Sequence, residues 1–186
     1  MSLLRAHALN IAAFFWGVAE ATLFFFVPDV LLTYIGVKQG PRAAAMASLI
    51  AALGAAVGGV LMFAWSQSDP NGAYAAVLAV PAISAEMARE AAAAMDANWF
   101  AATLLGPLSS TPFKLYAILA PHAGVTLPAF AAASIIARLP RFLIVGVGAA
   151  FLARQLRRRL NESQLLWLTA GAWILFYATF FALMPN

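Results

Sequence analysis

GPLSSTPFKLYAILAPHAG, residues 106–124, interrupts a hydrophobic region with three prolines and places a lysine, Lys114, directly after the interruption. Proline lacks a backbone N–H and clashes with the preceding turn, so Gly106–Pro112 cannot form a regular helix, with breaks at Gly106, Pro107 and Pro112. The apolar arms on either side, Trp99–Leu105 and Phe113–Leu119, are each too short to cross about 30 Å of hydrocarbon. The stretch therefore predicts a broken helix that dips into a membrane and returns.

The composition of the whole chain is that of a membrane protein. Of 186 residues, 64% are hydrophobic and 10% are charged, whereas a soluble domain has about 25% charged residues. The absence of cysteine excludes disulfides, iron–sulfur clusters and thiol catalysis. The basic excess is concentrated at Arg154 and Arg157–Arg159, which indicates a juxtamembrane anchor and not a nucleic-acid surface. We expect one integral membrane domain, 1–186, with no cofactor, no metal and no nucleic-acid partner.

The apolar runs predict an all-α polytopic protein. We expect spanning helices at 43–66, 127–153 and 164–184, and re-entrant hairpins at about 9–36 and 99–121. Pro28 should break the first hairpin. Turn chemistry makes Ser66–Gly72 a loop. The region 73–98 should be external and hold an amphipathic interfacial helix with Ser84 as its N-cap.

The positions of the basic residues set the expected orientation. If the first run turns near Pro28 and returns, Arg5, Lys38 and Arg42 share one side with the later arginine cluster. The loop 67–98 then lies on the other side. We therefore expect the N-terminus and 154–162 to be cytoplasmic. The two hairpins would enter from opposite sides as an inverted repeat, a common plan among secondary transporters.

Ionisable residues fall inside these apolar runs at five positions: Glu20, Asp29, Lys114, Arg138 and Arg141. Each costs roughly 2.5–3.5 kcal/mol at a helix centre, so unpaired burial in lipid is unfavourable. The two acids come from the first unit and the three bases from the second, and they could meet in a wet cavity between the breaks. Simpler interpretations are open. Asp29 and Lys114 could extend to the interface, and the arginines could be structural, pairing with Glu20 or with carbonyls freed by Pro140.

Three basic side chains beside hydroxyl groups suit an anionic ligand. Arginine favours bidentate contact with phosphate, and lysine acts as a compact point charge. Backbone N–H groups freed by a helix break also favour an anion. Ser109, Ser110 and Thr111 could bind such an oxyanion or only satisfy the opened backbone. Buried acids such as Glu20 and Asp29 can carry a coupling proton, so the residues predict transport of an anionic group.

Two further features have alternative interpretations. His122, after Pro121, is expected to be an exposed loop residue, with a proton relay as the alternative. Gly54 and Gly58 form a GxxxG spacing that could serve a homodimer or an internal helix contact. The sequence shows no nucleophile–base pair and no two-histidine motif, so we expect neither a catalytic site nor an enzyme.

In three segments the sequence resembles the DedA/VTT (SNARE-associated Golgi protein) superfamily, in its short-chain bacterial branch. The first segment, VAEATLFFFVPDVLL (18–32), has an acid followed by a proline-bearing acidic turn. The second, STPFKLYAILAPHAG (110–124), is similar to the family's Pro–basic–apolar hairpin. The third, ASIIARLPRFLIVG (133–146), is similar to a segment with two closely spaced arginines.

The resemblance implies two opposed re-entrant hairpins, lipid flipping or scrambling and, in bacteria, recycling of undecaprenyl phosphate. It carries the family's essential acids onto Glu20 and Asp29, and its essential bases onto Lys114, Arg138 and Arg141. We therefore predict a multi-pass lipid transporter of the bacterial inner membrane that recognises an anionic headgroup, either undecaprenyl phosphate or a phospholipid, with the acids carrying a proton. A small-ion or solute transporter and a non-transporting membrane scaffold are the alternatives.

Overall fold

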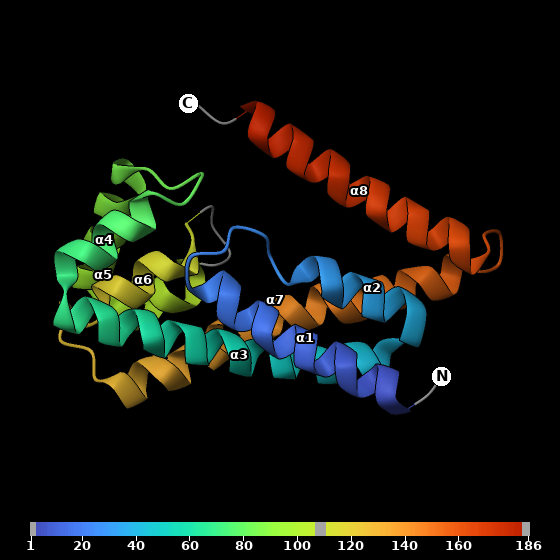
Figure 1. The fold of residues 1–186 in the computed structure, drawn as a ribbon, viewed down its shortest axis with the longest axis horizontal. Coiled ribbons are helices and arrows are strands. Elements are labelled where there is room, and N and C mark those ends of the chain that lie inside the picture. Colours follow the sequence, from blue (N-terminus) through green and yellow to red (C-terminus); the bar gives the residue numbers. More distant parts are fainter. Residues whose placement is uncertain (1–2, 107–110, 184–186) are drawn as a thin grey trace.

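The protein is all-helical. The computed structural model describes residues 3–106 and 111–183, and in these ranges it contains helices and no strand (Figure 1). The helices are α1 (Leu3–Ala21), α2 (Asp29–Gln39), α3 (Pro41–Ser68), α4 (Pro70–Leu78), α5 (Ala85–Leu105), α6 (Phe113–Leu119), α7 (Leu127–Leu156) and α8 (Glu162–Leu183).

Within the described ranges, α3, α7 and α8 are long and apolar enough to cross a membrane. They correspond to the predicted spans 43–66, 127–153 and 164–184, so three sufficiently long and apolar helices are confirmed at these positions. Helix α3 lies at the centre of the bundle, between α1 and α7, and most of its apolar span is buried. Helix α8 packs mainly on α2 and is almost wholly exposed, as lipid-facing helices are.

Helices α1 and α3 pack with their backbones in direct contact. A Cβ atom at Gly54 would collide with the carbonyl oxygen of Phe14, and one at Gly58 would collide with Val18. Gly17 makes the reciprocal approach from α1 to α3. Small residues at such spacing let helix backbones approach closely. The GxxxG face therefore serves an internal contact, which decides between the two interpretations that the sequence left open.

The first break in the helical backbone is longer than a proline kink. Helix α1 ends at Ala21, and α2 begins only at Asp29, with Pro28 as its N-cap. Proline is tolerated at a helix start because no N–H is needed there, so Pro28 begins α2 and does not itself end α1. Figure 1 shows α1 and α2 running in opposite directions, so that the hairpin returns to the end of the molecule where it began.

The segment Ser66–Gly72 is not the predicted loop. Helix α3 continues to Ser68, and α4 begins at Pro70, so that Asp69 alone separates them. The Asp69 carboxylate accepts a hydrogen bond from Gly72 N at 2.9 Å. The residues that favour turns here cap one helix and start the next, because Asp is a good N-cap and Pro fits the first turn.

The region 73–98 contains two helices where one was expected. The end of α4 and the start of α5 are separated by residues 79–84, and Ser84 accepts a hydrogen bond from Met87 N, which confirms the predicted N-cap. Helix α5 then bends at Asn98, whose φ/ψ values are non-helical and whose side chain accepts from Ala101 N. The bend coincides with the predicted boundary between the amphipathic helix and the second hairpin.

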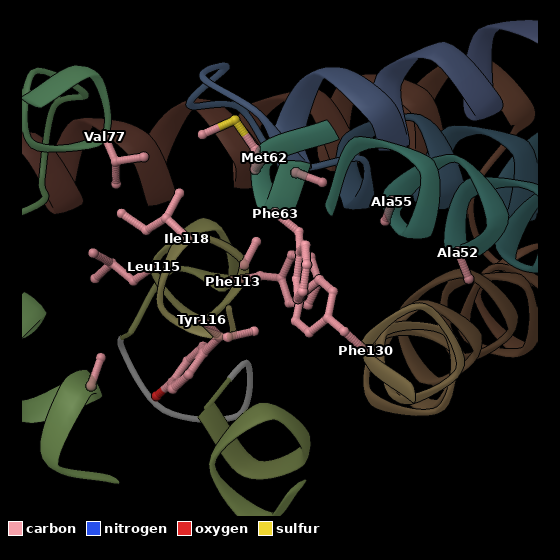
Figure 2. Packing of buried hydrophobic residues seen from close by; sticks show 14 of the residues in the cluster. Ala52, Ala55, Met62, Phe63, Val77, Phe113, Leu115, Tyr116, Ile118 and Phe130 are labelled. Atoms are coloured by element: carbon pink, nitrogen blue, oxygen red, sulfur yellow. The ribbon is translucent and has the colours of Figure 1, made fainter. Parts of the chain in front are cut away.

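The second hairpin is anchored to α3. Ser66 donates a hydrogen bond to the carbonyl oxygen of Ile118 near the end of α6, at 2.6 Å. The ring of Phe113 stacks on Phe130 of α7, which in turn packs against Phe63 of α3 (Figure 2). Helix α6 is therefore held in the core although it has only seven residues.

We predict that Gly54→Ala destabilises the protein by about 1–3 kcal/mol, because the added methyl group must push α1 away from α3. The measurement is the midpoint of thermal unfolding of the purified protein in detergent. Gly148→Ala is the matched control, since a Cβ atom there meets nothing within 4 Å. Equal stability of the two variants would contradict the proposed tight contact.

Candidate functional site: a charged internal cavity

A cavity of about 970 Å³ lies where the two broken regions meet. Its walls come from the first break, residues 80–84, the start of α6, the middle of α7 and the C-terminal half of α8. It contains every ionisable residue that the sequence placed inside apolar runs: Glu20, Asp29, Lys114, Arg138 and Arg141. The rest of its lining is mostly apolar and aromatic.

Arg138 and Glu20 form a deeply buried ion pair. The Nη2 of Arg138, from the middle of α7, donates to Oε2 of Glu20 at the end of α1, and the two side chains are only 2% and 8% exposed. The guanidinium also lies over the rings of Phe113 and Phe142, at 5.2 and 5.0 Å from their centroids. Ring faces attract cations, so the aromatic residues add to the stabilisation of this charge.

Arg141 and Asp29 form a second pair one turn further along α7. The Arg141 Nη2 donates to Asp29 Oδ2 at 2.7 Å. The arrangement is asymmetric, because the Arg141 side chain is 31% exposed whereas that of Asp29 is 2% exposed. The other carboxylate oxygen of Asp29, Oδ1, is buried and has no hydrogen-bond partner. Residues three apart on a helix lie on one face, which is why both arginines point to the first hairpin.

Lys114 joins the two broken regions directly. Its Nζ donates a hydrogen bond to the carbonyl oxygen of Phe24, at 2.9 Å. That carbonyl belongs to the non-helical segment between α1 and α2, where no helical N–H is available to it. Among the described residues, no carboxylate lies within ion-pair distance of Lys114. The lysine is therefore a buried cation that is compensated by a peptide dipole and not by an acid.

These contacts decide between the alternatives left by the sequence. The two acids and three bases do meet between the units, as predicted. Asp29 and Lys114 are buried, so the alternative that they extend to the interface is wrong. The alternative that Arg138 pairs with Glu20 agrees with the structure, and an ion pair of this kind is compatible with both a structural and a functional role.

The predicted hydroxyl groups and break residues lie in different places. Thr111 and Pro112 line the cavity, and Pro112 has an extended backbone before α6. Gly106 follows α5 and sits against the ring of Tyr116, away from the cavity lining. Pro107, Ser109 and Ser110 lie outside the described residues.

His122 is exposed, as predicted, and does not line the charged cavity. Its Nε2 lies 3.0 Å from Ser66 Oγ, beside a separate small cavity of about 250 Å³. The Ser66 hydroxyl donates its proton to the Ile118 carbonyl, so it is not held as a nucleophile. This contact links the end of α6 to α3, which gives Pro121–His122 a place in the fold.

Helix α8 contributes residues that the sequence did not single out. Tyr177 OH accepts a hydrogen bond from Val27 N at 3.1 Å, and Trp173 Nε1 donates to Thr33 at 2.9 Å. Both aromatic side chains line the cavity. A tyrosine and a tryptophan within a mostly apolar helix could have indicated these contacts, because buried Tyr and Trp side chains need hydrogen-bond partners.

The charges in the cavity do not cancel. Two carboxylates face three basic side chains, so the site carries a net charge of +1 when all are ionised. A surplus cation in a mostly apolar cavity favours an anionic ligand with an apolar part. Within the described residues, no group of three His, Asp or Glu side chains is placed to hold a metal ion.

The fold and the cavity together define an all-helical protein with three helices long and apolar enough to cross a membrane, among the residues described, and with a charged cavity. Comparisons with protein-family models, with characterised proteins and with solved structures give no match. The functional argument for this chain therefore rests on its own residues and their geometry.

We predict that Glu20→Gln destabilises the fold by about 3–5 kcal/mol, because it leaves the Arg138 charge buried without a partner. The double variant Glu20→Gln, Arg138→Met should recover most of this loss, since neither position then carries a charge that lacks its partner. Thermal unfolding of all the variants in detergent measures both effects.

The control for this pair is Glu86→Gln, which removes the exposed partner of Arg89. An exposed pair contributes at most about 1 kcal/mol. A double variant no more stable than Glu20→Gln would show that the ion pair is not the reason for the loss.

Proposed function

We propose that this protein is a membrane transporter of lipids with an anionic headgroup, a flippase or scramblase. The observation that carries the proposal is the net positive charge of a partly open cavity whose remaining lining is mostly apolar. Lys114 and Arg141 would bind the headgroup, because Lys114 has no acidic partner and Arg141 is the partly exposed member of its pair. Thr111 would donate a further hydrogen bond.

An amphiphile fits this cavity better than a small ion does. Phe25, Trp173, Phe176 and Phe180 form part of its wall, and α8 closes one side with little packing of its own. A lipid chain could lie against these rings while the headgroup reaches the charges. Polyprenyl phosphate, undecaprenyl phosphate in a bacterium, is the substrate that the sequence resemblance to the DedA/VTT superfamily implies. A phospholipid has the same headgroup chemistry.

The arrangement of the breaks supports a re-entrant, inverted-repeat plan. The first hairpin begins and ends at one end of the molecule, and the second returns to the opposite end of α3 beside Ser66 (Figure 1). The contact from Lys114 to Phe24 joins the two breaks. Non-helical backbone at membrane depth is tolerated where protein or a wet cavity covers it, and both breaks border such a cavity.

We further propose that Asp29, one of the two acids that the sequence suggested as proton carriers, couples a proton to transport. It lies opposite Arg141, the partly exposed arginine, so binding of an anion to Arg141 weakens its hold on the acid. A buried carboxylate that loses its counter-ion becomes neutral by taking up a proton. Transport of an anion together with a proton would also reduce the charge that crosses the membrane.

We predict that Lys114→Gln and Arg141→Gln each lower translocation at least tenfold, because a charge-assisted contact to phosphate contributes about 1.5–3 kcal/mol. The measurement is the rate at which a fluorescent phosphatidic acid becomes accessible to an external quencher in proteoliposomes. Arg158→Gln is the matched control. It removes an exposed arginine outside the cavity and should leave the rate unchanged.

The other outcomes either indicate a rival function or contradict the proposed site. Flux of inorganic phosphate without movement of the labelled lipid would indicate a small-solute transporter. Unchanged lipid translocation in both cavity variants would contradict the proposed headgroup site. Losses of translocation that run in parallel with losses of thermal stability would indicate a scaffold whose charges only hold helices together.

The same plan predicts a topology for the bacterial inner membrane, with the N-terminus and 154–162 in the cytoplasm. The chain has no cysteine, so single cysteines can be introduced without background. Cysteine at Asn71 should react with a membrane-impermeant maleimide in intact spheroplasts. Cysteine at Arg158 should react only after the membrane is permeabilised. The reverse pattern would invert the proposed orientation.

A further inference from the structure

We propose that Asp29 holds the position on Arg141 that a ligand anion would take, and that a bound headgroup displaces it from this arginine. This inference rests on the proposed function and names the residue that competes with the substrate. It assigns different roles to two acids that the sequence treats alike. Glu20 is a fixed counter-ion that positions Arg138, whereas Asp29 is an exchangeable one.

The first support is the difference between the two ion pairs. Both members of the Arg138–Glu20 pair are almost completely buried, and the guanidinium is covered by two aromatic rings. A ligand could reach this arginine only by unpacking the core. Arg141 is 31% exposed and lines the cavity, so a ligand can reach it without rearranging the helices.

The second support is the state of the Asp29 carboxylate. It is almost completely buried and lines the cavity, yet Oδ1 has no hydrogen-bond partner. A fixed structural carboxylate normally has both oxygens satisfied. The Asp29 carboxylate thus contacts Arg141 through one oxygen only, and Arg141 is accessible to ligand. A phosphate oxygen could accept the same hydrogen bond from Arg141 in its place.

The groups around Asp29 make the exchange electrostatically reasonable. Arg141 of α7 contacts it, and Tyr177 of α8 lines the same cavity. Glu20, Lys114 and Arg138 line the same cavity from α1, α6 and α7. The charges of Glu20 and Arg138 cancel each other. Asp29 and a monoanionic ligand then balance the two remaining cations, Lys114 and Arg141, so the site with its ligand is neutral overall.

Competition of this kind makes an unusual prediction, which is that removing an acid strengthens binding. We expect Asp29→Asn to bind dodecyl phosphate about tenfold more tightly than the unchanged chain, a typical size for coupling between two ligands. The measurement is titration calorimetry on the full-length protein in a non-ionic detergent. Asp96→Asn, which removes an exposed acid outside the cavity, should leave the affinity unchanged.

A second variant, Asp29→Ser, protects the test against misfolding, because serine is also neutral and suits a helix start. Titration with inorganic phosphate separates headgroup binding from binding of the whole amphiphile. Tighter binding of both probes by the variant places the competition at the headgroup, whereas a gain limited to dodecyl phosphate would contradict it.

The possible failures can be told apart. If the unchanged chain binds dodecyl phosphate and a folded Asp29 variant binds it equally or more weakly, this inference is wrong and the proposed function stands. If neither the unchanged chain nor any variant binds it, both are wrong. If both Asp29 variants fail to fold, Asp29 is a structural residue and the inference is overturned.

Discussion

The structure depends on one constraint, which is that a charge cannot be left unpaired in a hydrophobic interior. Glu20 and Asp29 come from the first broken hairpin, and Arg138 and Arg141 come from one face of α7. Neither the first hairpin nor α7 can bury its charged side chains without the other. The two ion pairs therefore fix the position of the first hairpin against α7, and they do so at the depth where its backbone is not helical. The cavity is a consequence of this arrangement, since the charged groups line the space that the missing helical turns leave.

The broken backbone imposes a related constraint on the second hairpin. Carbonyl groups between α1 and α2 have no helical partners, and one of them, that of Phe24, accepts from Lys114. Another, that of Phe26, accepts from Trp16. One lysine thus compensates an opened peptide group and leaves its own positive charge unmatched by an acid. The surplus charge that favours an anionic ligand arises from the same contact that joins the two breaks.

Much of this was predictable from the sequence, and the remainder has identifiable reasons. Long apolar runs identify α3, α7 and α8 because a span needs about 20 residues, and isolated charges in such runs identify the five site residues. Which acid meets which base could not be predicted, since it depends on how α7 rotates against α1. The break near Pro28 was predicted, although this proline starts α2 and does not end α1. The segment Ser66–Gly72 was misjudged because proline, aspartate and serine favour turns and helix starts alike. The contribution of Tyr177 was missed because hydropathy gives a lone tyrosine in a span little weight.

The loose attachment of α8 has a consequence for how freely this part of the chain can vary. Most of its surface touches no other helix, so its outer face needs only to remain apolar. Its placement depends on a few polar contacts, from Trp173 to Thr33, from Val27 to Tyr177, and from Lys38 and Arg157 to Glu162. It also depends on the rings of Phe25 and Phe26, which pack on the C-terminal half of α8, and on Leu165, which is buried near its start. Related chains should therefore keep the residues at these few positions, while the other positions of the helix vary among leucine, isoleucine and phenylalanine. A region that looks unrelated by residue identity could then still occupy the same place beside the cavity.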